Sequence, residues 1–213
     1  MGQTGRSSTP SLAGLTFNGI GATSDMEHKL YKPTGFVDRP QRILIVGHSH
    51  HKKEHEDDYE DFTIDTVEKA KAGEMQGFPF FARQPRYLEI ERQQYYETVA
   101  LMNFIPVALP HLYAKPSPDL LELGRQRFMR VLSQENPTHV FVITSRLKFG
   151  RDLSATSEEV RGEKLSVLTT SYGSFPMGSY HTTGGASLCC QLPHPQAAKT
   201  TAMQEAFALM LSK

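Results

Sequence analysis

Beyond residue 42 the chain carries several short, unbroken runs of apolar residues. The clearest is the aliphatic run 43–46, which ends at Gly47, and similar runs span 99–104 and 139–144. A weaker run spans 186–192. Unbroken runs of this length are typical of strands that are buried on both faces, as in parallel sheets. The pattern therefore predicts four central strands.

Between and after these runs, apolar residues recur at helical spacing. One helix is predicted to begin at Ser117, a capping residue followed by Pro118, and to end before Asn136 and Pro137. Its apolar side comprises Leu121, Phe128, Val131 and Leu132. A last helix is predicted over 197–211, with an apolar side of Ala202, Ala206, Phe207 and Met210. Strands that alternate with helices imply crossover connections, so we expect a three-layer α/β/α fold around a mainly parallel sheet.

The 213 residues suit one domain, at roughly 100 to 200 residues per domain. Residues 1–25 are rich in Gly, Ser and Thr without a sustained period, which predicts a flexible N-terminal arm. We therefore expect a single domain over 26–213, and we find no internal repeat that would indicate a solenoid.

The amino-acid composition limits which partners the protein can bind and in which cellular compartment we expect it. Lys and Arg together number 23, as do Asp and Glu, so any nucleic-acid site must be a local basic patch. Cys189 and Cys190 are adjacent and are the only cysteines, which excludes a disulfide framework and a four-thiolate zinc site. No stretch approaches about 18 apolar residues, and residues 1–11 are polar. We expect a cytoplasmic protein with no membrane partner, and no feature predicts a protein partner.

Candidate chemistry follows the apolar runs. Ligands of open α/β sheets bind beyond the carboxyl ends of the strands, which places the segments 47–51, 103–106, 144–146 and 192–195 at one edge. An aromatic loop, 77–81, lies between the first two strands. Asn103 offers an amide, His194 an imidazole and Phe80 an aromatic face. This set suits a flat heterocycle, because an amide can pair with a base's edge and a phenyl ring can stack on its face.

The order of these residues is similar to that in the uracil-DNA glycosylase superfamily. The motifs are Gly47 at a strand end, Gly77-x-Pro79-Phe80, Asn103 closing a strand, and His194-Pro195 before the last helix. The closest pattern resembles the single-strand-selective monofunctional uracil-DNA glycosylases, over about residues 40–212. The resemblance implies a uracil-DNA glycosylase-like fold and release of a base from DNA to leave an abasic site, without metal or cofactor. It also implies that Phe80, rather than its neighbour Phe81, stacks on the flipped base, that Asn103 reads the base's pairing edge, and that His194 stabilises the leaving base.

The loop after the first strand departs from the family. The family carries a carboxylate or amide one or two places past the glycine to position the attacking water, whereas His48 and Ser49 stand there here. This leaves His48, Ser49 and Glu54 as candidate catalytic residues, with Asp57 and Asp58 as further acids of the same loop. We expect His50 and His51 to help bind the base. The polar loop favours a larger, hydrophilic base, such as a hydroxymethylated or glucosylated phage pyrimidine, which would give a base-excision repair or antiviral role.

Basic residues near the predicted edge are candidates for the DNA backbone, namely Arg146, Lys148, Arg151 and Lys199. Arg125, Arg127 and Arg130 lie on the predicted helix after Ser117, where we expect them to form a solvated face. The glycine-containing segment 182–185 is a weak candidate for a phosphate loop, with Tyr180 and His181 beside it. The loop after His-Pro, where the family wedges into DNA, is shortened, since Gln196 follows Pro195 directly.

Two other functions remain open. His48, His50, His51 and His55 could serve a metal-dependent hydrolase, because 51–55 matches the H-x-x-E-H zinc pattern. A third possibility is a non-catalytic protein that binds modified bases.

Overall fold

The computed structural model describes residues 27–52, 57–147, 152–153 and 160–213. The predicted N-terminal arm, 1–25, lies outside these residues. The described residues contain one six-stranded sheet in the order β2-β1-β3-β6-β5-β4. Its strands are β1 (Ile43–Gly47), β2 (Val99–Asn103), β3 (His139–Ile143), β4 (Arg161–Thr170), β5 (Gly173–Thr182) and β6 (Gly185–Leu192).

The sheet is mixed but mostly parallel. β1 pairs in parallel with β2 and with β3, and β3 pairs in parallel with β6. These four strands are the ones that the apolar runs predict. β4, β5 and β6 follow one another as antiparallel hairpins, and β4 and β5 come from a part of the sequence that predicted no element.

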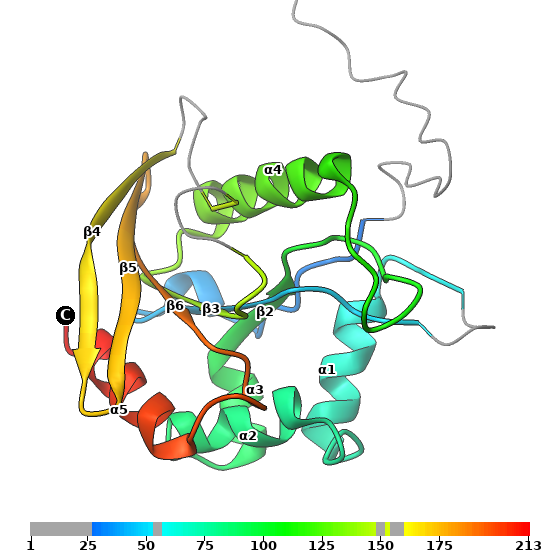
Figure 1. Cartoon of the computed structure of the whole chain (residues 1–213), viewed down its shortest axis with the longest axis horizontal. Coiled ribbons are helices and arrows are strands. Elements are labelled where there is room, and N and C mark those ends of the chain that lie inside the picture. The colour runs from blue at the N-terminus through cyan, green and yellow to red at the C-terminus, as the bar shows by residue number, and fades with distance from the viewer. Residues whose placement is uncertain (1–26, 53–56, 148–151, 154–159) are drawn as a thin grey trace, which may run out of the picture.

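Helices cover both faces of the sheet (Figure 1). Alternate strand residues divide between two cores: Leu44 and Val46 pack with Phe128, whereas Ile43 and Ile45 belong to the cluster of Phe207. The first core lies under α4 (Pro118–Glu135). The second lies under α1 (Phe62–Ala72), α2 (Pro79–Tyr87), α3 (Arg92–Thr98) and α5 (Thr200–Leu211). A short 3-10 helix, η2 (Phe36–Asp38), precedes β1. The predicted three-layer α/β/α fold is confirmed.

The two predicted helices form, with small differences. Ser117 caps α4 by accepting a hydrogen bond from the Leu120 amide, and α4 ends at Asn136 in the left-handed conformation (φ 45°). Leu121 is only partly buried. α5 begins three residues later than predicted, because the Ala197 amide bonds to the His194 carbonyl in a turn. Its four predicted apolar residues are all buried.

Arg127 does not lie on a solvated face, contrary to expectation. Its side chain is buried, and the guanidinium donates to the carbonyls of Asn103 and His28 and pairs with Glu27 at 3.0 Å. Arg125 and Arg130 do make exposed contacts, with Glu122 and Glu27. Arg127 therefore ties α4 to the chain at the end of β2.

The segment 182–185 is a hairpin turn between β5 and β6. It lies against Asn136, whose side chain donates to the Gly184 carbonyl, at the edge where β3 and β6 begin. Tyr180 is buried against Phe128. The possible phosphate loop and its neighbour Tyr180 thus lie away from the strand ends that carry the candidate site.

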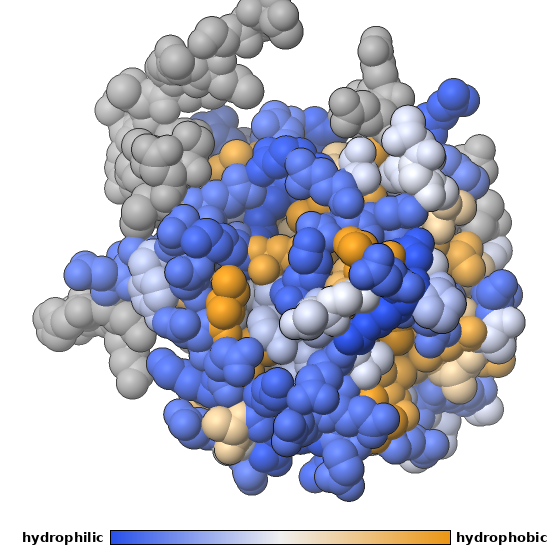
Figure 2. All heavy atoms as spheres, turned by 180° about the vertical axis from the view of Figure 1, so that it is seen from behind, coloured by the Kyte–Doolittle hydropathy of each residue, from blue (hydrophilic) through white to orange (hydrophobic). Residues whose placement is uncertain are grey.

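The described surface is mixed in character. Figure 2 shows that the face opposite to that of Figure 1 is mostly hydrophilic, with separate small hydrophobic patches. None of the described helices has the length and apolar character needed to cross a membrane.

Candidate functional site

The carboxyl ends of the four parallel strands bring distant segments to one edge of the sheet. Gly47 at the end of β1 is the register partner of Asn103 at the end of β2, and Ile143 of β3 is that of Leu192 of β6. The segments 47–51, 103–106, 144–146 and 192–195 all leave the sheet at this edge, as the sequence predicts. Open α/β sheets place their ligands there.

Gly47 is in close contact with two of the predicted site residues. A Cβ atom built on Gly47 would overlap the Asn103 Oδ1 and would lie 3.1 Å from the Phe80 ring. The Asn103 amide and the Phe80 ring therefore meet over the bare Cα of this glycine. Only glycine leaves that space free, which gives the residue a role in the site that does not depend on its backbone conformation.

The side-chain amide of Asn103 has no hydrogen-bond partner among the residues that the structure describes, and Asn103 is 5% exposed. The amide atoms are not among the fully buried polar atoms without a partner, so they lie within reach of solvent. Its main-chain carbonyl, in contrast, accepts a bond from Arg127, which fixes the residue in place. The amide offers its NH2 group as a donor and its oxygen as an acceptor to a ligand that enters the site.

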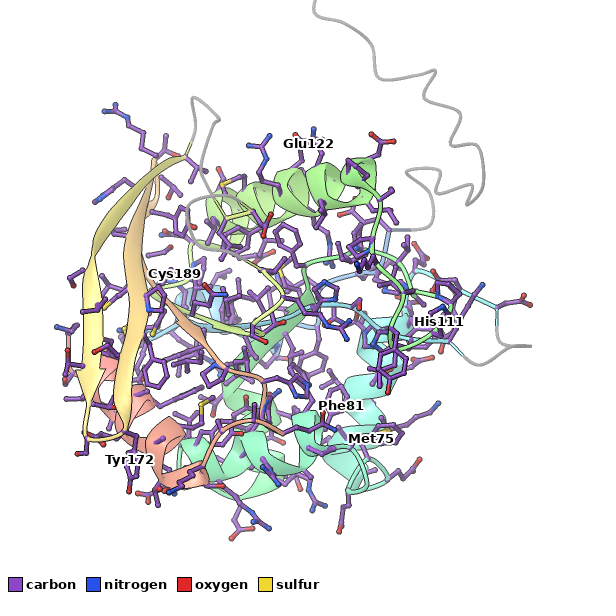
Figure 3. All side chains as sticks on the ribbon, in the orientation of Figure 1. Met75, Phe81, His111, Glu122, Tyr172 and Cys189 are labelled. Atoms are coloured by element: carbon purple, nitrogen blue, oxygen red, sulfur yellow. The ribbon has the colours of Figure 1, made fainter. Side chains whose placement is uncertain are left out.

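Phe80 links Asn103 to His194. The rings of Phe80 and His194 have centroids 6.0 Å apart and planes inclined by 26°. Phe81 meets Phe80 edge-on at 5.1 Å and lies at the start of α2 (Figure 3). Both phenylalanines are half-buried and pack on the same core, but Phe80 is the one that reaches Gly47 and His194. The structure thus brings Phe80, Asn103 and His194 together.

His194 is held as a neutral imidazole. Its pKa is lowered by burial and, to a smaller extent, by the charge of Arg146. Its Nδ1 accepts a hydrogen bond from the Gln196 amide at 3.3 Å, so the ring proton belongs on Nε2. The arrangement provides an N–H donor without a positive charge on the ring.

Arg83, a residue that the sequence did not single out for the site, ties α2 to the loop of His194. Its guanidinium donates to the Pro195 carbonyl. α2 carries Phe80, so this bond sets the position of Phe80 relative to His194. The sequence around Arg83 does not indicate this role, because the hydrogen bond joins two segments that lie more than a hundred residues apart.

Loss of this bond should loosen the site. The family resemblance implies base release, and we expect Arg83→Met to lower the rate of that reaction by roughly tenfold, because a misplacement of about 1 Å is costly to a positioned site. Arg86→Met is the matched control, since Arg86 is exposed on the same helix and its side chain makes no hydrogen bond to a described residue. Single-turnover rates of the two variants measure the effect, and equal rates would assign Arg83 no positioning role.

Substitution of Gly47 tests the contact at its Cα. We expect Gly47→Ala to displace the Asn103 amide and to lower the rate of the base release that the resemblance implies by roughly 10- to 100-fold. Gly77→Ala is the control, because a Cβ there meets nothing within 4 Å. If Gly47→Ala retains the rate of Gly77→Ala, the space over Gly47 is not part of the working site.

The loop after β1 runs beside the chain that follows β2. The Phe104 and Ile105 amides donate to the carbonyls of Gly47 and His48, and the Leu109 amide donates to that of His50. The predicted base-binding residue His50 is buried: its Nε2 lies 3.0 Å from Thr63 Oγ1 on α1, and its ring packs on Phe62. His50 therefore belongs to the packing of α1 rather than to the group around Phe80.

A buried polar cluster adjoins His50. The rings of His28 and His50 lie 5.4 Å apart, and His28 Nε2 contacts the Asp58 carboxylate. That carboxylate also accepts a bond from the Ala108 amide at 2.9 Å. Asp58, a candidate acid of this loop, is thus committed to holding the loops. Glu54, another candidate, lies outside the described residues.

His48 and Ser49 lie directly after Gly47, where the resemblance predicts the residue that positions the attacking water. His48 Nδ1 lies 2.9 Å from Ser49 Oγ. Burial lowers the pKa of His48 to about 4, with the charges of Arg146 and His51 acting in the same direction. The pKa of His51 is also lowered, mainly by burial. His48 is therefore a neutral imidazole at neutral pH.

These histidines make stability depend on pH. Burial lowers the pKa of His48 from 6.5 to about 4 and that of His50 to about 3, so the unfolded chain binds more protons between pH 6.5 and pH 4. We expect the free energy of unfolding in urea to fall as the pH is lowered from 7 to 5. His50→Gln should lessen this dependence and exposed His181→Gln should not. A pH dependence unchanged by His50→Gln would contradict the burial argument.

Of the four residues predicted to contact the DNA backbone, the structure describes two, Arg146 and Lys199. Arg146 is exposed just beyond β3, with its amide bonded to Thr144 Oγ1 and its guanidinium donating to the Leu112 carbonyl at 2.9 Å. Its charge acts on His48, His51 and His194, which places it beside the site. Lys199 is exposed at the start of α5. Lys148 and Arg151 lie outside the described residues.

The described residues do not contain a group of three or more His, Cys, Asp or Glu side chains that could hold a metal ion. His48, His50 and His51 are within that set, and His50 turns toward α1. His55, the last residue of the H-x-x-E-H pattern, lies outside it.

Comparisons with known proteins do not assign the chain to a family. None of the models of known protein families matches the chain, and no curated protein does. Roles for Phe80, Asn103 and His194 are therefore inferred from the residues and their geometry alone.

Proposed function

We propose that the protein is a monofunctional DNA glycosylase, which hydrolyses the N-glycosidic bond of a damaged or modified base and leaves an abasic site. The observation that supports the proposal is the contact of the Asn103 side chain and the Phe80 ring over Gly47, with the His194 imidazole beside Phe80 and the Asn103 amide left free of hydrogen bonds to the described residues. A planar base with hydrogen-bonding groups on one edge satisfies all three side chains at once.

Each residue has a task in this mechanism. The target nucleotide leaves the base stack, its base lies against Phe80, and its edge pairs with Asn103. As the glycosidic bond stretches, negative charge collects on the base, and the His194 Nε2–H donates to it. A neutral donor is well suited here, because it stabilises the leaving base without releasing a proton.

Water completes the reaction at the sugar. The sugar becomes oxocarbenium-like, so a weak nucleophile suffices if it is well positioned. His48 and Ser49, which directly follow Gly47, are the candidates for positioning this water. Arg146 and Lys199 provide positive charge for the DNA phosphates, which fix register without reading sequence.

We further propose that the base is a modified pyrimidine larger and more hydrophilic than uracil, such as a hydroxymethylated or glucosylated cytosine of phage DNA. The support is the polar, histidine-rich loop after β1, with His48 and Ser49 in place of a carboxylate or amide. An antiviral role would follow from that substrate.

A panel of oligonucleotides tests the proposal. The panel carries uracil, hypoxanthine, hydroxymethylcytosine or glucosylated hydroxymethylcytosine, each in single and double strands. We expect alkali-labile sites with one of the modified cytosines, unaffected by a chelator. Activity lost to chelator would favour a metal-dependent hydrolase instead.

One observation favours a non-catalytic binder as the second candidate: Asp58, an acid of the loop after β1, is occupied by His28 and the Ala108 amide. Binding of a modified oligonucleotide without any alkali-labile site would support that role and would overturn the glycosylase.

A further inference from the structure

Leu112 and Tyr113 form an exposed apolar pair on the loop between β2 and α4. Tyr113 is 81% exposed and Leu112 is 52% exposed. A single exposed apolar residue is ordinary on a protein surface. Two in succession are held here on a fixed turn, because the Ala114 amide donates to the His111 carbonyl at 3.0 Å.

This loop lies at the rim of the candidate site. The Arg146 guanidinium donates to the Leu112 carbonyl at 2.9 Å. The same guanidinium is close enough to lower the pKa of His48 and of His194. His111, the residue before Leu112, faces the loop of His51, whose pKa it affects. Arg146 therefore joins the exposed pair to the edge where Asn103 and His194 lie.

When a nucleotide is extruded, the DNA at the rim of the site loses base stacking. The bases on either side of it lose a stacking partner, which costs a few kcal/mol per step. Proteins offset this cost with aromatic or apolar side chains, which stack on any base because every base has a π-face.

The turn after His194 does not provide such a side chain. Its exposed residues are Gln196, Ala197 and Lys199, which are polar or small. Leu112 and Tyr113 are the exposed apolar pair that Arg146 connects to the site.

We propose that Leu112 and Tyr113 stack on the nucleobase that adjoins the extruded nucleotide. This inference rests on the proposed function and adds a second contact with DNA, independent of the identity of the excised base. Arg146 then has two tasks: it holds this loop through the Leu112 carbonyl and places its charge near the phosphates.

The probe is an oligonucleotide that carries a tetrahydrofuran abasic analogue next to 2-aminopurine, whose emission reports the stacking of that base. We expect binding of the protein to change this emission. Leu112→Ala with Tyr113→Ala should abolish the change and weaken binding by roughly 5- to 100-fold, as expected for one stacked base. Both side chains are exposed, so the variant should keep its unfolding midpoint in urea.

Tyr172→Ala is the matched control. Tyr172 is 51% exposed on the β4–β5 hairpin, on the opposite side of the molecule from His111 (Figure 3). It should leave affinity and emission unchanged. Wild-type affinity and emission in the double variant would overturn the stacking role, as would an equal loss in Tyr172→Ala. Base release from the panel is read separately: its absence in wild type overturns the proposed function, whatever the emission shows.

Discussion

Replacement of Asn103 by alanine is expected to lower the rate of base release by roughly 10²- to 10³-fold, the loss typical of one preorganised hydrogen-bonding group in an active site. The amide makes no hydrogen bond to a described residue, whereas the main-chain carbonyl that Arg127 holds is retained in the variant. The free energy of unfolding should therefore change little. Single-turnover base release and urea unfolding of the same preparation separate the two effects.

Asn103→Asp makes this test sharper. The carboxylate has the size of the amide but lacks its N–H donor, so a base that needs the donor should be released as slowly as by Asn103→Ala. A full rate in both variants, with the fold intact, would remove Asn103 from the site.

Replacement of His194 by alanine should have an effect of the same size, roughly 10²- to 10³-fold on the rate. The imidazole is neutral, because its pKa is lowered by burial and by Arg146. In the proposed mechanism its Nε2–H is the donor for the leaving base. His194→Gln restores an N–H donor and should recover part of the rate.

His181→Gln controls for the loss of any histidine. His181 is exposed near the turn between β5 and β6, at the edge of the sheet where β6 begins. It should keep the wild-type rate. If His194→Ala is as active as His181→Gln, the leaving base is stabilised by another group.

The parallel half of the fold could be predicted because its signals are local. Residues 43–46 are aliphatic without a break since both faces of β1 are covered, and Ser117 with Pro118 marks the start of α4 within one turn. β4 is the edge strand and β5 lies next to it. Neither was predicted, because exposed and buried residues mix in β5 and Pro176 and Gly178 interrupt its pattern.

Only those parts of the site that follow from the topology of the parallel strands could be predicted. Gly47, Asn103 and His194 follow strand ends, so the edge rule brings them together. The rule does not say which way a side chain turns, and His50 packs on Phe62 instead. Arg83 and Arg127 look like surface charges in the sequence, and their roles come from contacts with Pro195 and Asn103 that only the folded chain creates.

Mass spectrometry of free bases tests most directly whether a planar base is held between Asn103, Phe80 and His194. Wild type and Gly77→Ala should release the same base from one oligonucleotide of the panel, whereas Gly47→Ala and Asn103→Ala should release it far more slowly. Release at the wild-type rate by Asn103→Ala, or no free base from any oligonucleotide with wild type, would contradict the account.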